Sequence, residues 1–295
     1  MHDRIMNVRS SVSIHQVVKA VAGNSANMED ALAIEEPLEI RILYSDRSNR
    51  VTKNVSVTMR TPGNDDELAI GFLFTEGIIR DLNDLFSVGH IAISCAENKE
   101  NVILLDFNED ARPDLKGADR NFYTTSSCGV CGKGSINAIK TVSLFPASEI
   151  DAISIEQEVL ISLPNLLRER QNVFEATGGL HGCALFSSEG ELKLVREDVG
   201  RHNALDKLIG AALKLNLLPL KNSILLLSGR VSFELVQKAA MAGIRIIAAV
   251  GAPSSLAVQL AQEVNITLVG FLRDQRFNIY TQQQRIKLPQ YENQD

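Results

Sequence analysis

The sequence predicts an α/β protein in which a smaller α+β domain precedes a larger α/β domain. Two observations lead to this fold class. After residue 220, apolar runs of strand length alternate with segments of helical period, which is typical of a parallel βαβαβ sheet. Alternating strand patterns instead dominate residues 35–107. The chain has 295 residues, and at roughly 150 residues per domain this length suits one large or two ordinary domains.

The amino-terminal part divides into an arm and a domain. Residues 1–34 are polar and weakly patterned, so we expect a variable, loosely held arm. In the domain at 35–115, acidic residues after Thr61 predict a helix start, and the helix ends near Gly77. Four strands are expected there: Glu39–Tyr44, Val51–Arg60, His90–Ser94 and Val102–Phe107. The polar segment that follows predicts the domain boundary, so the second domain takes residues 116–295.

The second domain has the stronger periodicity. Helices are expected at Ile136–Leu144, Ile155–Leu167, Arg201–Leu215, Ser232–Ala242 and Pro253–Glu263. A hairpin is expected from Ala184–Phe186 and Leu192–Val195, and buried strands at Ser223–Ser228, Ile244–Val250 and Ile266–Phe271. The last three strands alternate with helices, so they predict a parallel sheet.

Composition excludes several functional classes. Thirty Lys and Arg residues stand against 36 Asp and Glu, for a net charge of −6, and Trp is absent. This balance argues against a nucleic-acid binder or an anionic-membrane binder. We find no secretory segment and no apolar run of about 18 residues that could span a membrane. The expected location is therefore cytoplasmic. Four cysteines in 295 residues are also too few for a disulfide scaffold.

The most informative segment is Thr124–Ser135, with the sequence TTSSCGVCGKGS. Cys128 and Cys131 are flanked by glycines and precede an expected helix, and Lys133 lies close in sequence. Helix N–H groups and a lysine favour thiolate over thiol, which suits nucleophilic sulfur chemistry. The spacing alone is equally compatible with a zinc site, so both interpretations stay open at this point.

The zinc interpretation has a definite form. His181 and Cys183 could complete a Cys3His site with Cys128 and Cys131. The H-x-C spacing is unlike the usual zinc-binding pairs, and no second Cys-x-x-Cys is present. His181 taken alone is better explained as a core residue or one that orients a substrate.

A second pattern concerns anions. Ser228–Arg230 ends a predicted parallel strand just before a helix, where open α/β sheets bind phosphates on free helix N–H groups. Gly251–Ser255 repeats this placement, and Phe271–Arg276 is expected to repeat it with two arginines. Arg201 and His202 begin another helix. Neither a G-x-G-x-x-G nor a P-loop motif is present, so ordinary nucleotide-binding motifs do not apply.

Five segments together resemble one family. They are MRTPGNDDELAIGFLFTEGII, TTSSCGVCGKGS, FEATGGLHGCALF, REDVGRHNALDK and LLLSGR. In this order they resemble the FdhD family, the sulfur-carrier accessory proteins of formate dehydrogenase. The likeness runs from about residue 35 to residue 288.

The resemblance implies a function and partners. It implies a sulfurtransferase that receives sulfur from a cysteine desulfurase as a persulfide on Cys128, the first cysteine of the family's motif; Cys131 matches the second. The sulfur passes to the molybdenum (or tungsten) bis-guanine-dinucleotide pterin cofactor, bound as acceptor and cargo, before its insertion into formate dehydrogenase. The family also implies a homodimer and a cytidine deaminase-like fold for the larger domain.

The same resemblance implies a cofactor-binding segment. Its residues are Phe271, Leu272, Arg273, Asp274, Gln275 and Arg276. The deaminase zinc signature is not met, because Ser127 replaces its proline and His181 follows the cysteine pair. The competing interpretations are a zinc-stabilised nucleotide-binding module or a deaminase-like hydrolase, and the missing signature counts against the hydrolase. A thiol-disulfide oxidoreductase has less support, because it would need a thioredoxin-type setting for the cysteine pair.

Overall fold

A six-stranded mixed sheet forms the centre of the larger part of the chain. The computed structural model describes residues 11–47, 49–91, 101–115, 145 and 153–289. The sheet has the order β13-β12-β11-β10-β8-β9. Its strands are β8 (His181–Phe186), β9 (Leu192–Asp198), β10 (Ile224–Leu227), β11 (Ile246–Ala249), β12 (Thr267–Arg273) and β13 (Arg276–Thr281). Strands β10, β11 and β12 are parallel, which confirms that part of the prediction, while β8, β9 and β13 pair antiparallel.

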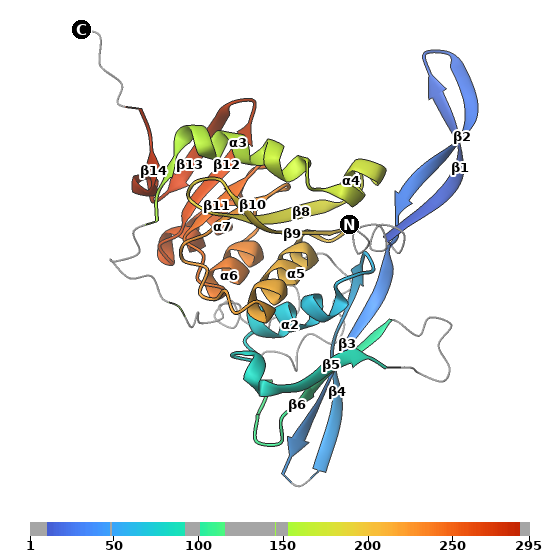
Figure 1. Cartoon of the computed structure of the whole chain (residues 1–295), viewed down its shortest axis with the longest axis vertical. Helices are drawn as coiled ribbons and strands as arrows, with labels where there is room; N and C mark the ends of the chain where they lie inside the picture. The colour runs from blue at the N-terminus through green and yellow to red at the C-terminus, as the bar shows by residue number, and fades with distance from the viewer. Residues whose placement is uncertain (1–10, 48, 92–100, 116–144, 146–152, 290–295) are drawn as a thin grey trace.

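Helices cover both faces of this sheet (Figure 1). They are α3 (Gln157–Arg168), α4 (Asn172–Thr177), α5 (Arg201–Lys214), α6 (Phe233–Met241) and α7 (Ser255–Glu263). Leu225 and Leu227 of β10 belong to the hydrophobic cluster that includes α5, α6 and α7, whereas Ile224 and Leu226 belong to the cluster that includes α3. Because both faces of the strand are buried, its sequence is apolar without alternation.

A four-stranded sheet forms the smaller part, in the order β4-β3-β6-β5. Its elements are β3 (Glu36–Asp46), β4 (Asn49–Arg60), β5 (Leu85–His90), β6 (Val102–Phe107) and the helix α2 (Asp65–Thr75), with a 3-10 turn at Leu82–Asp84. The strand expected at His90–Ser94 was placed too late. Strand β5 instead ends at His90, because its antiparallel partner β6 begins in register with that end.

Helices α2 and α5 cross with their backbones in contact and join the two parts. A Cβ on Gly71 would lie 1.9 Å from the main-chain oxygen of Asp206, and one on Gly210 would lie 1.9 Å from that of Glu67. Only glycine permits this approach. One hydrophobic cluster therefore runs from the four-stranded sheet through both helices to the six-stranded sheet.

The amino-terminal segment differs from its prediction. Strands β1 (Val12–Val21) and β2 (Asn24–Ala33) form an antiparallel ribbon that projects from the body (Figure 1). Ala22 and Gly23 join the strands with positive φ angles of 43° and 89°, as a tight hairpin turn requires. Valines on β1 supply the strand preference, which the polar composition of the arm concealed.

The remaining elements are short. Strand β7 (Ile155–Glu156) pairs in parallel with β14 (Ile286–Lys287), and a 3-10 turn covers Gln283–Arg285. The helix expected at Ile136–Leu144 lies outside the described residues. No helix in the described ranges combines the length and apolar character that crossing a bilayer requires.

Candidate functional site

Glycines crowd the carboxyl edge of the parallel strands. Gly229 follows β10 and Gly251 follows β11, and a Cβ on Gly251 would lie 2.8 Å from the carbonyl oxygen of Gly229. A Cβ on Gly270, near the end of β12, would lie 2.8 Å from the ring Cδ of Pro253. The loops therefore pack backbone against backbone. As the sequence predicts, Ser228–Arg230 leads into α6 and Gly251–Ser254 leads into α7.

Phe271 has a strained backbone at this edge. Its φ angle is +55°, in the left-handed region that aromatic residues rarely adopt. Its N–H donates to the carbonyl oxygen of Gly251 at 3.1 Å, and the side chain is half-buried. Left-handed non-glycine residues cluster at functional sites, so this outlier marks the edge as a candidate site.

The segment after Phe271 corrects one expectation. No helix follows β12; Asp274 and Gln275, both with positive φ, turn the chain directly into β13. Arg273 and Arg276 are opposite each other in the ladder, and both are exposed. The two arginines therefore lie on a hairpin tip instead of at a helix start. The side chain of Leu272 is buried in the core.

His181 lies at the same edge, at the first residue of β8. A Cβ on Gly229 would lie 3.1 Å from its Nδ1, so the ring packs over the glycine. None of the described residues hydrogen-bonds to the half-buried ring. Burial and then the Arg201 guanidinium lower its pKa, and Asp198 opposes this shift. The imidazole is consequently neutral at neutral pH.

Arg201 and His202 begin α5, as expected, but they have different surroundings. The Nε2 atom of His202 lies 3.1 Å from Ser232 Oγ and 3.0 Å from Glu234 Oε2, which connects the starts of α5 and α6. Arg201 makes no hydrogen bond or ion pair with any described residue, and its Nε is buried. Arg230 is exposed. Among the described residues, neither Arg201 nor Arg230 has a carboxylate partner at this edge.

Asp198, which the sequence analysis did not single out, fixes the turn before α5. The carboxylate is fully buried. It accepts hydrogen bonds from Gly200 N at 2.8 Å and Thr61 N at 3.2 Å, and its Oδ2 lies 2.7 Å from Lys207 Nζ. Because Thr61 lies 137 positions away in sequence, only the folded chain brings it to the carboxylate. Asp198 holds in place the turn that presents Arg201.

Cys183 does not suit the zinc interpretation. Its side chain is 1% exposed and lies in the hydrophobic cluster beneath α5. Burial strongly raises the pKa of its thiol, so it is protonated and inert. Among the described residues, no group of three or more His, Cys, Asp or Glu side chains could hold a metal ion. Cys128 and Cys131 lie outside the described residues.

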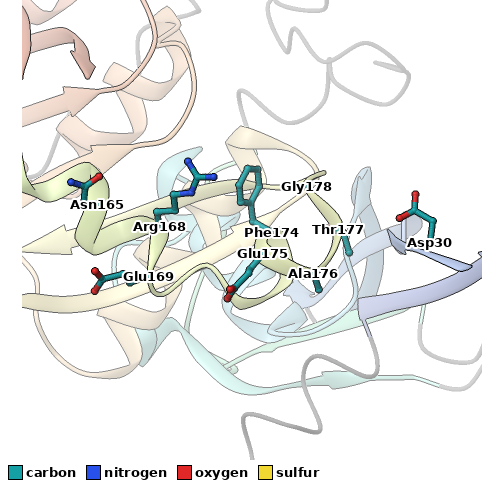
Figure 2. Close-up of a pocket in the computed structure, with 9 residues that line it drawn as sticks. All are labelled: Asp30, Asn165, Arg168, Glu169, Phe174, Glu175, Ala176, Thr177 and Gly178. Carbon is teal, nitrogen blue, oxygen red and sulfur yellow. The ribbon is translucent and has the colours of Figure 1, made fainter. Parts of the chain in front are cut away.

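A hollow of about 830 Å³ lies between the hairpin and the helices α3 and α4 (Figure 2). Its charged lining is three carboxylates, Asp30, Glu169 and Glu175, and one guanidinium, Arg168. Phe174 supplies an aromatic wall. The acidic lining does not suit an anionic ligand, so this hollow is chemically distinct from the carboxyl edge of the sheet.

Comparisons with known proteins agree with the motifs. A protein named Sulfur carrier protein FdhD from Mycolicibacterium paratuberculosis is 50% identical over 279 residues, which cover 93% of this chain and 98% of that protein. A protein of the same name from Sulfolobus acidocaldarius is 42% identical over 275 residues, with 92% and 98% covered.

A solved structure is also similar to this chain. A protein from Desulfotalea psychrophila, assigned as a formate dehydrogenase accessory protein, superposes with a TM-score of 0.70 at 25% identity. The match covers 94% of this chain and 99% of that chain. The sequence profile of the FdhD/NarQ family matches residues 33–287. The chain therefore belongs to the FdhD/NarQ family.

Proposed function

We propose that this protein is a sulfur carrier that receives sulfur from a cysteine desulfurase and delivers it to a molybdenum or tungsten bis-guanine-dinucleotide pterin. The loaded cofactor is then inserted into formate dehydrogenase. The observation that carries the proposal is the 50% identity to a sulfur carrier protein FdhD over nearly the whole chain. Arg201 and Arg230 at the carboxyl edge, which form no ion pair with any described residue, support it, since the cargo carries phosphates.

The sulfur step is a thiolate exchange. The Cys128 thiolate attacks the outer sulfur of the desulfurase persulfide, the S–S bond of that persulfide breaks, and the desulfurase cysteine leaves as a thiolate. Cys128 then holds the persulfide, which is more acidic than a thiol and is a good sulfur donor at neutral pH. Glycines beside Cys128 and Cys131 leave room for a protein donor and then for a large cofactor.

Cys131 is proposed to assist release. Its thiolate attacks the inner sulfur of the Cys128 persulfide, hydrosulfide leaves toward the metal, and a Cys128–Cys131 disulfide remains. A dithiol reductant must restore the two thiols before the next cycle. Cys131→Ala is then expected to load sulfur normally and deliver it slowly. Delivery at the normal rate by this variant would remove Cys131 from the mechanism.

The first experiment is non-reducing peptide mass spectrometry after incubation with a cysteine desulfurase and cysteine. We expect one added sulfur atom on the peptide with Cys128, and none in Cys128→Ala. Cys183→Ala is the matched control, because its buried thiol should leave loading unchanged. Unmodified thiols together with stoichiometric zinc would instead favour the zinc-stabilised nucleotide-binding module.

Quaternary structure is the remaining part of the proposal. We propose a cytoplasmic homodimer, on the strength of the family resemblance. Light scattering after size-exclusion chromatography of the full chain would give the mass directly. A mass of one chain at the concentrations used for sulfur loading would contradict the dimer without touching the sulfur chemistry.

A further inference from the structure

We propose that Arg201 and His181, whose ring packs over Gly229, form a receptor for an oxyanion of the phosphate class. This receptor is separate from the arginines of the β12–β13 turn. Oxyanion binding is inferred from the burial and missing hydrogen bonds of these side chains and from the β8–β9 register, which sets His181 opposite Asp198, three residues before Arg201. Its identification with a phosphate of the pterin dinucleotide rests on the proposed function.

The Arg201 side chain lacks a hydrogen-bond acceptor among the described residues. Its guanidinium is half-buried, its Nε is shielded from solvent, and no described residue accepts a hydrogen bond from it. A guanidinium in such a place is normally paired, because an unsatisfied buried donor costs free energy. An anionic acceptor from outside the described chain would satisfy it.

The carboxylates near the start of α5 already have other partners. Asp198 is fully buried and paired with Lys207, and it also accepts hydrogen bonds from the turn before α5. Glu234 lies against His202. Neither acid forms an ion pair with Arg201, so the positive charge at the start of α5 stays uncompensated in this part of the described structure.

His181 supplies the second hydrogen-bond donor of the proposed receptor. Gly229 leaves space for the imidazole, whose nitrogens have no hydrogen-bond partner among the described side chains and backbone. Burial and Arg201 keep the ring neutral, so it carries one N–H donor. A bound oxyanion between the ring and the guanidinium would accept from both groups and would raise the pKa of the histidine.

The donor set favours a phosphate over a carboxylate. A planar guanidinium takes two oxygens of one ligand side by side. A carboxylate has only those two oxygens, whereas a tetrahedral phosphate offers a further oxygen out of that plane for the imidazole. Gly200, the residue before α5, supplies no side-chain cap to the first turn of the helix.

Calorimetry of the full chain with pyrophosphate tests the receptor. Arg201→Gln is expected to weaken binding on the order of tenfold or more, because it removes charge-assisted hydrogen bonds. Arg112→Gln is the control, since it removes the same charge from an exposed arginine in the loop after β6, outside this edge, and it should change affinity by about twofold or less. Equal losses in the two variants, or no loss in Arg201→Gln, would overturn the receptor.

A measurement on the unmodified protein covers the case in which Arg201→Gln does not fold. Nuclear magnetic resonance of the His181 ring, assigned with His181→Gln, is followed against pH with and without pyrophosphate. We expect the anion to shift the midpoint of the His181 titration upward. An unchanged midpoint at saturating pyrophosphate would overturn the proposal.

The same samples separate this inference from the proposed function. Sulfur loading of Cys128 should persist in Arg201→Gln, because the receptor acts on the cofactor and not on the desulfurase. Loss of pyrophosphate binding with intact loading would confirm the receptor as a distinct subsite. Pyrophosphate binding in a protein that never accepts sulfur would preserve the receptor and refute the carrier mechanism.

Discussion

Helix α5 carries charged side chains along its buried length and at its first turn. These two groups of side chains differ in burial and in their ion-pair partners. Asp206 and Lys207 are almost completely buried, and each has a partner of opposite charge within 2.9 Å. Arg201, one or two turns earlier, is half-buried and has no partner among the described residues. The paired charges connect α5 to neighbouring elements, and the charge of Arg201 is the one that we propose to bind an anion.

The paired group is a connection between helices. Lys238 of α6 donates to Asp206 of α5 and to Thr75 of α2, at 2.9 Å in each case. Lys207 also donates to the carbonyl oxygen of Thr61 at 2.8 Å. The contacts to Thr75 and Thr61 span 163 and 146 positions of sequence, so they form only when the two parts of the chain are folded against each other.

Breaking the buried pair should have the largest effect on stability. Lys238→Met leaves Asp206 without its counter-charge, and removal of one partner from a buried pair costs about 3–5 kcal/mol. Urea denaturation should show this loss in the free energy of unfolding. The double variant Lys238→Met with Asp206→Asn should recover much of it. A loss below about 1 kcal/mol in the single variant would place the pair among weak surface ion pairs.

The backbone crossing of α2 and α5 gives the next largest effect. Gly210→Ala places a methyl group where the Glu67 carbonyl oxygen lies. The helices must move apart, and overpacking of this kind costs about 1–3 kcal/mol or more. Gly89→Ala is the matched control, because nothing lies within 4 Å of its added methyl. Similar midpoints of thermal unfolding for the two variants would contradict the close crossing.

A smaller effect on the free energy of unfolding is expected at His181, and it depends on pH. Burial lowers the pKa of His181 in the folded protein. Below the unfolded value of about 6.5, the unfolded chain binds a proton that the folded chain does not, so stability should fall as pH decreases through this range. His181→Gln should reduce that fall between about pH 7 and 5. Parallel curves of unfolding temperature against pH for the two proteins would contradict the lowered pKa.

The sequence predicts the core of this fold well, for a physical reason. The strands at Ser223–Ser228 and Ile244–Val250 lie between two helical layers, so their apolar runs report burial directly. The hairpin β1–β2 has most of its residues exposed, so it lacks that signal. Strand β13 was missed because the turn at Asp274 and Gln275 uses left-handed residues that are not glycine.

The site was predictable in part for a related reason. Arg201 and His202 could be placed at a helix start from local pattern. Their states could not be predicted, because Asp198 reaches Thr61 across 137 positions of sequence, and His202 reaches Ser232 across 30. Such pairings follow from tertiary structure. The cysteine pair stays a prediction from motif and family.

The smallest effect on stability is expected at the β12–β13 turn. Arg273 and Arg276 are exposed and face each other across a hairpin. Like charges at that position repel weakly, so Arg273→Ala or Arg276→Ala should change the free energy of unfolding by about 0.5 kcal/mol or less. If the segment binds the cofactor, each variant should nevertheless weaken binding of GDP measured by calorimetry. Unchanged affinity in both would remove the turn from the nucleotide site and leave Arg201 and His181 as the candidate anion receptor at this edge.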